Sequence, residues 1–174
     1  MGVDVFCTSP HKWLGAPKGL GLAYVSKSIQ KILRPMWVTW GQKEWSQTAR
    51  QYEDYGTRNL AEVLALGNAI TFHTAVEQPL REQRLQEIWQ HTKKRAEDHK
   101  QTRFNSPHDF SVGSPVMSIE ILNADSKKLA ESIFRDHQIV VRPFKIGKKN
   151  AVRISPNIYT TTAEVDRFFD VLEG

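Results

Sequence analysis

Lys12 lies in a loop that limits the possible folds of this chain more than any other segment does. The loop, residues 9–21, reads SPHKWLGAPKGLG and joins two short apolar runs at residues 3–8 and 19–25. Surface lysines usually lie on helices among other charges, whereas this one follows a strand, where α/β enzymes place catalytic groups. A partly desolvated lysine near an anion site serves as an amine nucleophile. We therefore predict that Lys12 forms a Schiff base with a carbonyl cofactor.

The composition indicates an ordinary globular protein. The 174 residues suffice for one domain or two small ones, and 40% of them are hydrophobic and 25% charged. We expect no membrane span, because no apolar run is long enough, and no secretory leader. The single cysteine, Cys7, excludes an internal disulfide and a cysteine-based zinc cluster, and we predict no metal site. One unpaired cysteine is consistent with a reducing, cytoplasmic location.

The net charge of +5 leaves one alternative function open. The basic residues form short clusters at 93–95, 127–128 and 148–149. A nucleic-acid-binding surface would use such clusters, but no motif for nucleic-acid binding accompanies them. We favour solvated helix faces, and we therefore expect neither nucleic acid nor a membrane as a partner.

The N-terminal part of the chain predicts two strands, a short helix and a long loop. Residues 3–8 and 19–25 are predicted as buried strands, and residues 28–33 as a helix that Pro35 ends. Residues 37–51 hold three of the five tryptophans without a clear period. We interpret this segment as a loop whose tryptophans serve packing or dimer contacts, with the wall of a substrate pocket as the alternative.

Two long helices are predicted next. Asn59 and Glu62 come close to a capping box, and apolar residues at helical spacing follow as far as residue 76. Pro79 begins the second helix, which is predicted to run to about Thr102. We expect residues 1–100 to form part of a larger domain together with these connecting helices.

The last third of the chain predicts a small α+β unit over residues 101–174. A cluster of helix breakers at 105–108 opens it. The elements expected after it are a strand at 116–122, a helix capped by Asp125 with Leu129, Ile133 and Phe134 inside, strands at 139–141 and 151–155, and a last helix capped by Thr161 and Glu164 with Val165, Phe168, Phe169 and Leu172 inside.

Three groups of residues carry chemistry. The first is Ser9, His11 and Lys12 in the glycine-rich loop. The second is the turn 55–59 (YGTRN) at a helix start, where backbone N–H groups, the helix dipole and the Thr57 hydroxyl would bind an anion. The third is Arg153 on a strand, where a guanidinium grips a carboxylate with two parallel hydrogen bonds.

Together these segments resemble the C-terminal part of class V aminotransferase-fold enzymes, of the isopenicillin N epimerase and cysteine desulfurase kind. The resemblance rests on three motifs in this order: HKWLxxPxGxG from His11, GTRN from Gly56, and VRIS from Val152 with its YxTxxEVD tail. It implies an α/β fold, namely the C-terminal part of a PLP-transferase large domain with a mixed, mostly parallel sheet and helices, followed by the small α+β domain. It also implies pyridoxal 5′-phosphate (PLP) as cofactor and an amino acid as substrate.

The resemblance also implies a role for each site residue. Lys12 would be the Schiff-base lysine and would move the Cα proton, Ser9 and His11 would bind the cofactor phosphate, Thr57 would reach the phosphate of a neighbouring subunit in a homodimer, and Arg153 would bind the substrate α-carboxylate. The reaction would be of epimerase, lyase or aminotransferase type.

The chain departs from the family pattern in two ways. Family members are more than twice as long, and their N-terminal half would supply an aspartate for the pyridine nitrogen. The segment 141–150 has no cysteine, so no persulfide mechanism is expected. A truncated, non-catalytic fragment that serves a structural or partner-binding role is therefore the alternative. Two roles remain open for Arg142. It could form an ion pair at a strand edge, which we favour, or it could be a second contact to the anion.

Overall fold

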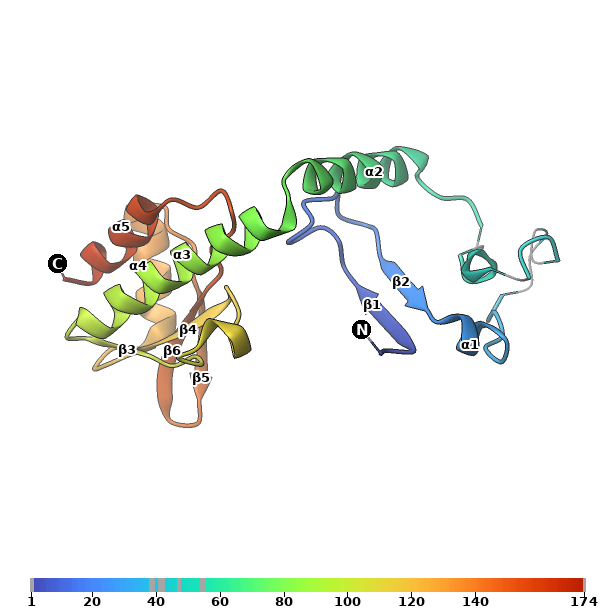
Figure 1. Cartoon of the computed structure of the whole chain (residues 1–174). Coiled ribbons are helices and arrows are strands. Elements are labelled where there is room, and N and C mark those ends of the chain that lie inside the picture. Colours follow the sequence, from blue (N-terminus) through green and yellow to red (C-terminus); the bar gives the residue numbers. More distant parts are fainter. Residues whose placement is uncertain (1, 38–39, 41–42, 47, 54–55, 174) are drawn as a thin grey trace. The chain divides into compact units, whose positions relative to one another are not determined.

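The computed structural model describes residues 2–37, 40, 43–46, 48–53 and 56–173. The chain divides into two compact units, Met1–Val76 and Glu77–Gly174 (Figure 1). This division falls before the boundary expected at residue 101, because the long helix that precedes residue 101 packs within the second unit. No described helix combines the length and the apolar character that crossing a bilayer requires.

The described residues of the first unit form a two-stranded sheet and three helical segments. Strand β1 (Val5–Thr8) pairs antiparallel with β2 (Leu22–Val25), with Val5 opposite Val25 and Thr8 opposite Leu22. The helical segments are α1 (Lys27–Gln30), the short 3-10 helix η1 (Ala49–Tyr52) and α2 (Leu60–Ala75). Both predicted strands and both predicted helices of this part of the chain are present, and η1 lies at the end of the expected loop. Parts of that loop lie outside the described residues.

The apolar surfaces of the first unit are exposed. We predicted that both strands are buried, and this was wrong: every residue of β1 is exposed, and only Val25 of β2 is buried. Among the described residues, each of these strands pairs only with the other. Helix α2 begins as predicted at the cap Asn59, whose side chain accepts a hydrogen bond from the Ala61 N–H. Its apolar stripe, which includes Leu60, Leu64 and Ile70, has no buried member. The periodicity of α2 thus marks a face that no described element covers.

The described residues of the second unit form a four-stranded antiparallel sheet, three α-helices and one short 3-10 helix. Its elements are α3 (Gln78–Asp98), β3 (Thr102–Phe104), the 3-10 helix η2 (Phe110–Val112), β4 (Met117–Ile121), α4 (Ser126–His137), β5 (Arg142–Ile146), β6 (Lys149–Ile154) and α5 (Thr162–Glu173). The strand order is β3-β4-β6-β5. The expected α/β fold class is confirmed, whereas the parallel strand pairs implied for the large domain are not among the described residues.

The hydrophobic core of the second unit lies between one face of this sheet and the helices. Met117, Ile119 and Ile121 alternate along β4 and are buried, and Val152 of β6 lies on the same face. Helices α3 and α5 lie side by side over this face (Figure 1), and α4 adds Ile133 to the core. All four residues predicted to line the inner side of the last helix are buried. The intervening strand residues, Ser118 and Arg153 among them, therefore lie on the opposite face.

Three local predictions in the second unit were wrong. The strand predicted at 139–141 is an irregular segment, because Ile139 and Val141 pack against the core without pairing, and β5 begins only at Arg142. Helix α3 ends at Asp98 and not near Thr102, which instead starts β3 and donates from its hydroxyl to the Ala96 carbonyl. Phe134, expected inside, is 53% exposed.

The predicted cap of α5 provides a test of local stability. The Thr161 N–H and hydroxyl both donate to the Glu164 carboxylate, at 2.8 and 2.9 Å, and the Glu164 N–H donates to the Thr161 hydroxyl at 3.2 Å. We expect Thr161→Ala to lower the free energy of unfolding by about 1 kcal/mol at neutral pH, since a helix loses its cap. Urea denaturation of both proteins measures this difference, and equal midpoints would contradict it.

The pH dependence of this cap has a definite sign. The backbone hydrogen bond from Thr161, followed by that of its side chain, lowers the pKa of Glu164 below its ordinary value of 4.5. A carboxyl with a depressed pKa in the folded state stabilises the protein above its unfolded pKa, and this stabilisation disappears as the pH falls through the folded value. The difference between wild type and Thr161→Ala should therefore shrink below the ordinary pKa of Glu164.

Candidate active site

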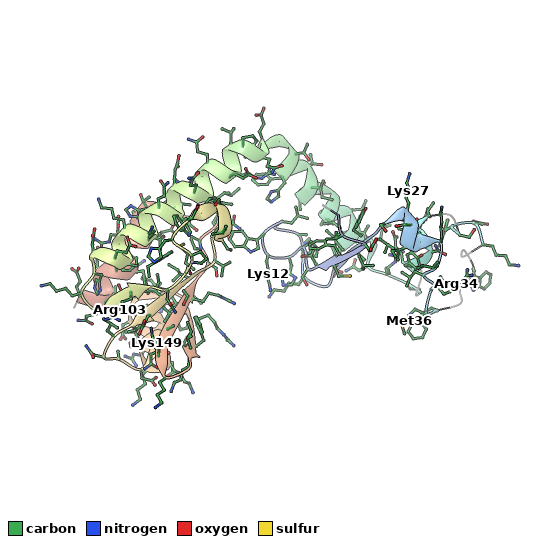
Figure 2. All side chains as sticks on the ribbon, turned by 60° about the horizontal axis from the view of Figure 1, so that its bottom comes forward. Lys12, Lys27, Arg34, Met36, Arg103 and Lys149 are labelled. Atoms are coloured by element: carbon green, nitrogen blue, oxygen red, sulfur yellow. The ribbon has the colours of Figure 1, made fainter. Side chains whose placement is uncertain are left out.

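The loop that carries Lys12 is closed by its own backbone. Ser9 follows the last residue of β1, and Pro10 is buried. The Ala16 N–H donates to the Pro10 carbonyl and the Gly15 N–H to the Lys12 carbonyl, both at 3.2 Å. Gly15 has a φ of +71°, a conformation that favours glycine. These bonds fold the loop tightly and leave the Lys12 side chain exposed (Figure 2).

The polar groups of this loop are not used by the described protein. Ser9 and Lys12 are exposed and His11 is half-buried. Across the described residues, no hydrogen bond or ion pair includes the side chain of any of the three. A hydroxyl, an imidazole and an amine within four consecutive residues can together take a phosphate group and an aldehyde. The donor set of the loop therefore fits the cofactor that the sequence indicated.

A contact that the sequence did not predict joins this loop to α2. Gly19 has a φ of +97°, and a Cβ atom added there would lie 3.0 Å from Oε2 of Glu62. Glu62 was expected to complete a capping box with Asn59, but in the described structure its carboxylate lies against Gly19 without a hydrogen bond to the Asn59 backbone. The only sequence signal was the acidic residue in the first turn of a helix. Gly19 thus allows a close approach between the Lys12 loop and α2.

The second predicted group is a turn immediately before α2. Gly56 has a φ of +125°, and Thr57 is exposed with a hydroxyl that makes no hydrogen bond to the described residues. Nη1 of Arg58 lies 3.7 Å from Oε2 of Glu53, an ion pair across the turn and not within its own helix. Tyr55, also in the predicted group, lies outside the described residues. The turn presents Thr57 at a helix N-terminus, which suits an anion.

The C-terminal end of the Lys12 loop and the turn before α2 border one cavity. A space of about 470 Å³ lies between β2 and α2. Gly19 and Gly21 line it from the Lys12 loop, and Arg58, Asn59 and Glu62 line it from the turn and the start of α2. Lys12 and Thr57 do not line this cavity. The structure therefore brings the end of the Lys12 loop and the turn before α2 together within the first unit.

Arg153, the third group, lies in the second unit on β6. It is exposed, with Ser118 of β4 directly opposite on one side and Arg142 of β5 on the other. The turn that follows β6 is held by Arg84 of α3, which donates to the carbonyl of Thr160 at 2.7 Å and of Ile158 at 3.4 Å. Arg84 had no signal in the sequence, because its partners are backbone atoms more than seventy residues away. The predicted site residues thus lie in both units, with Lys12 and Thr57 in the first and Arg153 in the second.

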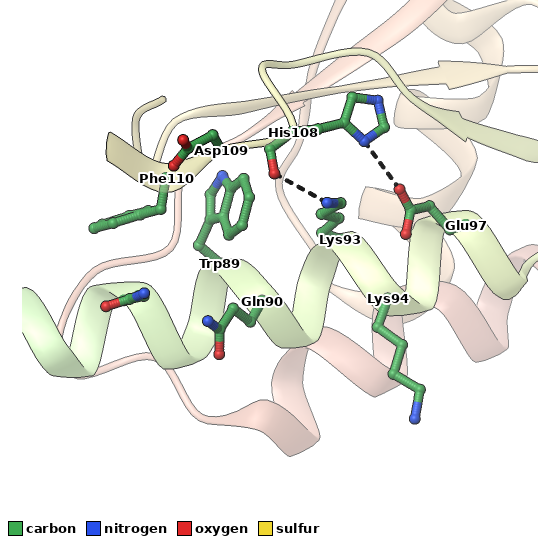
Figure 3. Close-up of a pocket in the computed structure, with 9 residues that line it drawn as sticks. Trp89, Gln90, Lys93, Lys94, Glu97, His108, Asp109 and Phe110 are labelled. Carbon is green, nitrogen blue, oxygen red and sulfur yellow. Dashed lines mark hydrogen bonds and ion pairs between the residues drawn. The ribbon is translucent and has the colours of Figure 1, made fainter. Parts of the chain in front are cut away.

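The second unit has a groove whose charged residues serve mainly to hold the protein together. It measures about 450 Å³ and runs along α3 beside Trp89 and Phe110 (Figure 3). Lys93 donates to the His108 carbonyl at 3.0 Å, and Nδ1 of His108 lies 3.2 Å from Oε1 of Glu97. These contacts attach the segment after β3 to α3 (Figure 3), so Lys93, Glu97 and His108 of this groove bind other groups of the protein itself.

Comparison with known proteins gives the family. A family model described as Aminotransferase class-V matches residues 1–168. The isopenicillin N epimerase of Streptomyces clavuligerus is 24% identical, over 98% of this chain and 47% of its own length. The chain spans about half the length of the curated relatives it matches.

Solved structures agree on the fold. The apo cysteine desulfurase from Thermococcus onnurineus NA1 superposes with a TM-score of 0.84 at 20% identity, over 98% of this chain and 46% of that chain. A variant of C-DES, solved with glycine covalently linked to its PLP cofactor, superposes with a TM-score of 0.78 at 17% identity, over 98% of this chain and 46% of that chain. The family model covers nearly the whole sequence, and the expected family is confirmed: the chain belongs to the class V aminotransferases, whose cofactor is pyridoxal phosphate.

Proposed function

We propose that this chain is the part of a PLP-dependent enzyme that supplies the Schiff-base lysine and the carboxylate-binding arginine for an amino-acid substrate. The observation that carries the proposal is the Lys12 loop. Its backbone is closed by hydrogen bonds, while the side chains of Ser9, His11 and Lys12 make no hydrogen bond or ion pair to the described residues. Polar groups held in place without protein partners are what a bound ligand requires.

The proposed roles follow from the chemistry of each side chain. Nζ of Lys12 would hold the cofactor covalently through its aldehyde group. Ser9 and His11 donate hydrogen bonds to the phosphate, which fixes the cofactor beside the amine. When bound, the cofactor draws electrons from the substrate Cα. Nζ of Lys12 would also accept or return the Cα proton of the substrate.

Two further roles lie outside this loop. Arg153 binds the substrate α-carboxylate through two parallel hydrogen bonds, which orients the Cα–H bond. Thr57 donates its hydroxyl to the phosphate held by a second subunit, so the proposed assembly is a homodimer. We assign residues 1–100 to the cofactor-binding large domain and residues 101–174 to the small domain. Cys7 is exposed and unpaired, which suits a reducing cytoplasm.

The reaction is of epimerase, lyase or aminotransferase type. All three begin when a lysine removes a proton from Cα, and they differ in where that proton or the nitrogen goes afterwards. The similarity to isopenicillin N epimerases supports the first type. The segment 141–150 contains no cysteine, which argues against a desulfurase.

Reductive trapping tests the proposal. The purified chain is mixed with pyridoxal phosphate, reduced with borohydride, digested and examined by mass spectrometry. We expect the pyridoxyl group on the peptide that contains Lys12 at a stoichiometry well above that of any other lysine, because Ser9 and His11 retain the phosphate there. Lys18, which is exposed in the same loop, is the internal reference. Equal labelling of Lys12 and Lys18 would sink the proposal.

A further inference from the structure

Arg153 has a cross-strand neighbour of the same charge. In the register of β5 and β6, Arg142 lies directly opposite Arg153. Residues directly opposite in an antiparallel pair share a face, with Cβ atoms about 4.5–5.5 Å apart. This face is the one turned away from the core, because the neighbouring residue of β6, Val152, is buried among the helices. Both arginines are exposed.

No described carboxylate balances the two arginines. Neither side chain takes part in a hydrogen bond or an ion pair with the described residues. The acidic residue nearest to them along the same face of β4, Glu120, pairs with Lys149 at 3.1 Å. Like charges directly opposite each other destabilise a sheet, so the pair has a cost that folding does not explain. An anionic ligand between the arginines would remove this repulsion.

A third polar group completes the row. Ser118 of β4 lies opposite Arg153 on its other side. Its hydroxyl oxygen is buried and has no hydrogen-bond partner among the described residues. The row Ser118, Arg153, Arg142 therefore offers one hydroxyl and two guanidinium groups on three adjacent strands.

Each of the two arginines can bind a complete carboxylate group by itself. A guanidinium fork uses both oxygens of a carboxylate when it binds in the bidentate geometry. A second fork beside it then needs a second anionic group. We propose that Arg142 is a specificity-determining residue that binds a side-chain carboxylate, and that the substrate is an α-amino acid with such an acidic side chain. This inference rests on the proposed function, in which Arg153 binds the α-carboxylate.

Binding of simple carboxylic acids tests the inference without the cofactor. Glutarate carries two carboxylates, and pentanoate has the same number of carbons with only one. Calorimetric titration of the full chain should show that glutarate binds about tenfold more tightly, since a charge-assisted bidentate pair contributes on this scale. Arg142→Gln should remove this preference while pentanoate affinity stays within about twofold. Arg142→Lys should fall between, because it keeps the charge and loses the fork.

A matched control separates this site from net charge. Lys145 lies on the same strand, three residues from Arg142 and thus on the other face. Lys145→Gln removes the same charge and should leave the glutarate preference intact. The proposal would be overturned if wild type bound glutarate and pentanoate with equal affinity. It would also be overturned if Arg142→Gln weakened the binding of both acids equally, or if Lys145→Gln removed the glutarate preference as Arg142→Gln does. A failure here leaves the labelling of Lys12 untouched, so the two proposals fail separately.

Discussion

Lys12→Ala should abolish the absorption band at the edge of the visible range that pyridoxal phosphate gives when it is joined to a protein amine. The expected loss is complete, because the band requires the C=N bond and no neighbouring amine replaces Nζ of Lys12. Lys18 is separated from Lys12 by the closed segment that ends at Ala16, whose N–H is bonded to Pro10. Ser9 and His11 lie within three residues of Lys12 in the sequence, whereas Lys18 is seven residues beyond His11.

Matched variants make this result specific. Lys18→Ala removes an exposed lysine from the same loop and should leave the band unchanged. His11→Ala should keep the band at saturating cofactor but require about tenfold more of it, since one charge-assisted or neutral hydrogen bond to phosphate is lost. Circular dichroism of all variants checks that the fold is retained. A band that persists in Lys12→Ala, or that disappears equally in Lys18→Ala, would refute the assignment of Lys12.

Local chemistry explains which parts of the fold were predictable. The caps at Asn59, Asp125 and Thr161 depend on atoms within three residues of each other, and the structure contains all three. The alternation of β4 was likewise visible, because one face packs on the helices of its own unit. Such features are set by neighbouring residues, and the rest of the fold only has to accommodate them.

Features that depend on distant segments were not predictable in the same way. The apolar stripe of α2 correctly indicated a helix but could not show that the described chain leaves it uncovered. The apolar run Ile139–Val141 resembles a strand, yet it packs against the core without a pairing partner. The position of β5 is instead set by the hairpin turn at Gly147, whose φ of +59° favours glycine, and by the register of β5 with β6.

In the candidate site, too, the features set by neighbouring residues were predictable and those that need distant segments were not. The adjacency of Ser9, His11 and Lys12 follows from the sequence, and so does the turn before α2. The contact of Glu62 with Gly19 and the opposition of Arg142 to Arg153 do not, because each requires two segments to meet in one register. This is why the sequence favoured a strand-edge ion pair for Arg142, whereas the described structure offers that side chain no carboxylate.

Phe169→Ala should lower the free energy of unfolding of the second unit by about 3–5 kcal/mol, the range for removal of a buried aromatic ring. Phe169 is 0% exposed in α5. Its ring lies 5.0 Å from the ring of Phe168 and 6.1 Å from that of His99, and the guanidinium of Arg95 lies 5.6 Å from its centre. The substitution therefore leaves a cavity between α5 and α3 and removes a cation–π contact as well.

Phe134→Ala is the control for this experiment. It deletes the same ring from α4, where the side chain is 53% exposed, so the expected loss is below about 1 kcal/mol. Guanidinium denaturation of the full chain, followed by far-ultraviolet circular dichroism, compares the three proteins. Since domains of this size are stable by only about 5–15 kcal/mol, Phe169→Ala should bring the second unit close to unfolding at 37 °C. Equal losses for the two variants would mean that the ring of Phe169 is not buried as described, and the core between α3 and α5 would have to be redrawn.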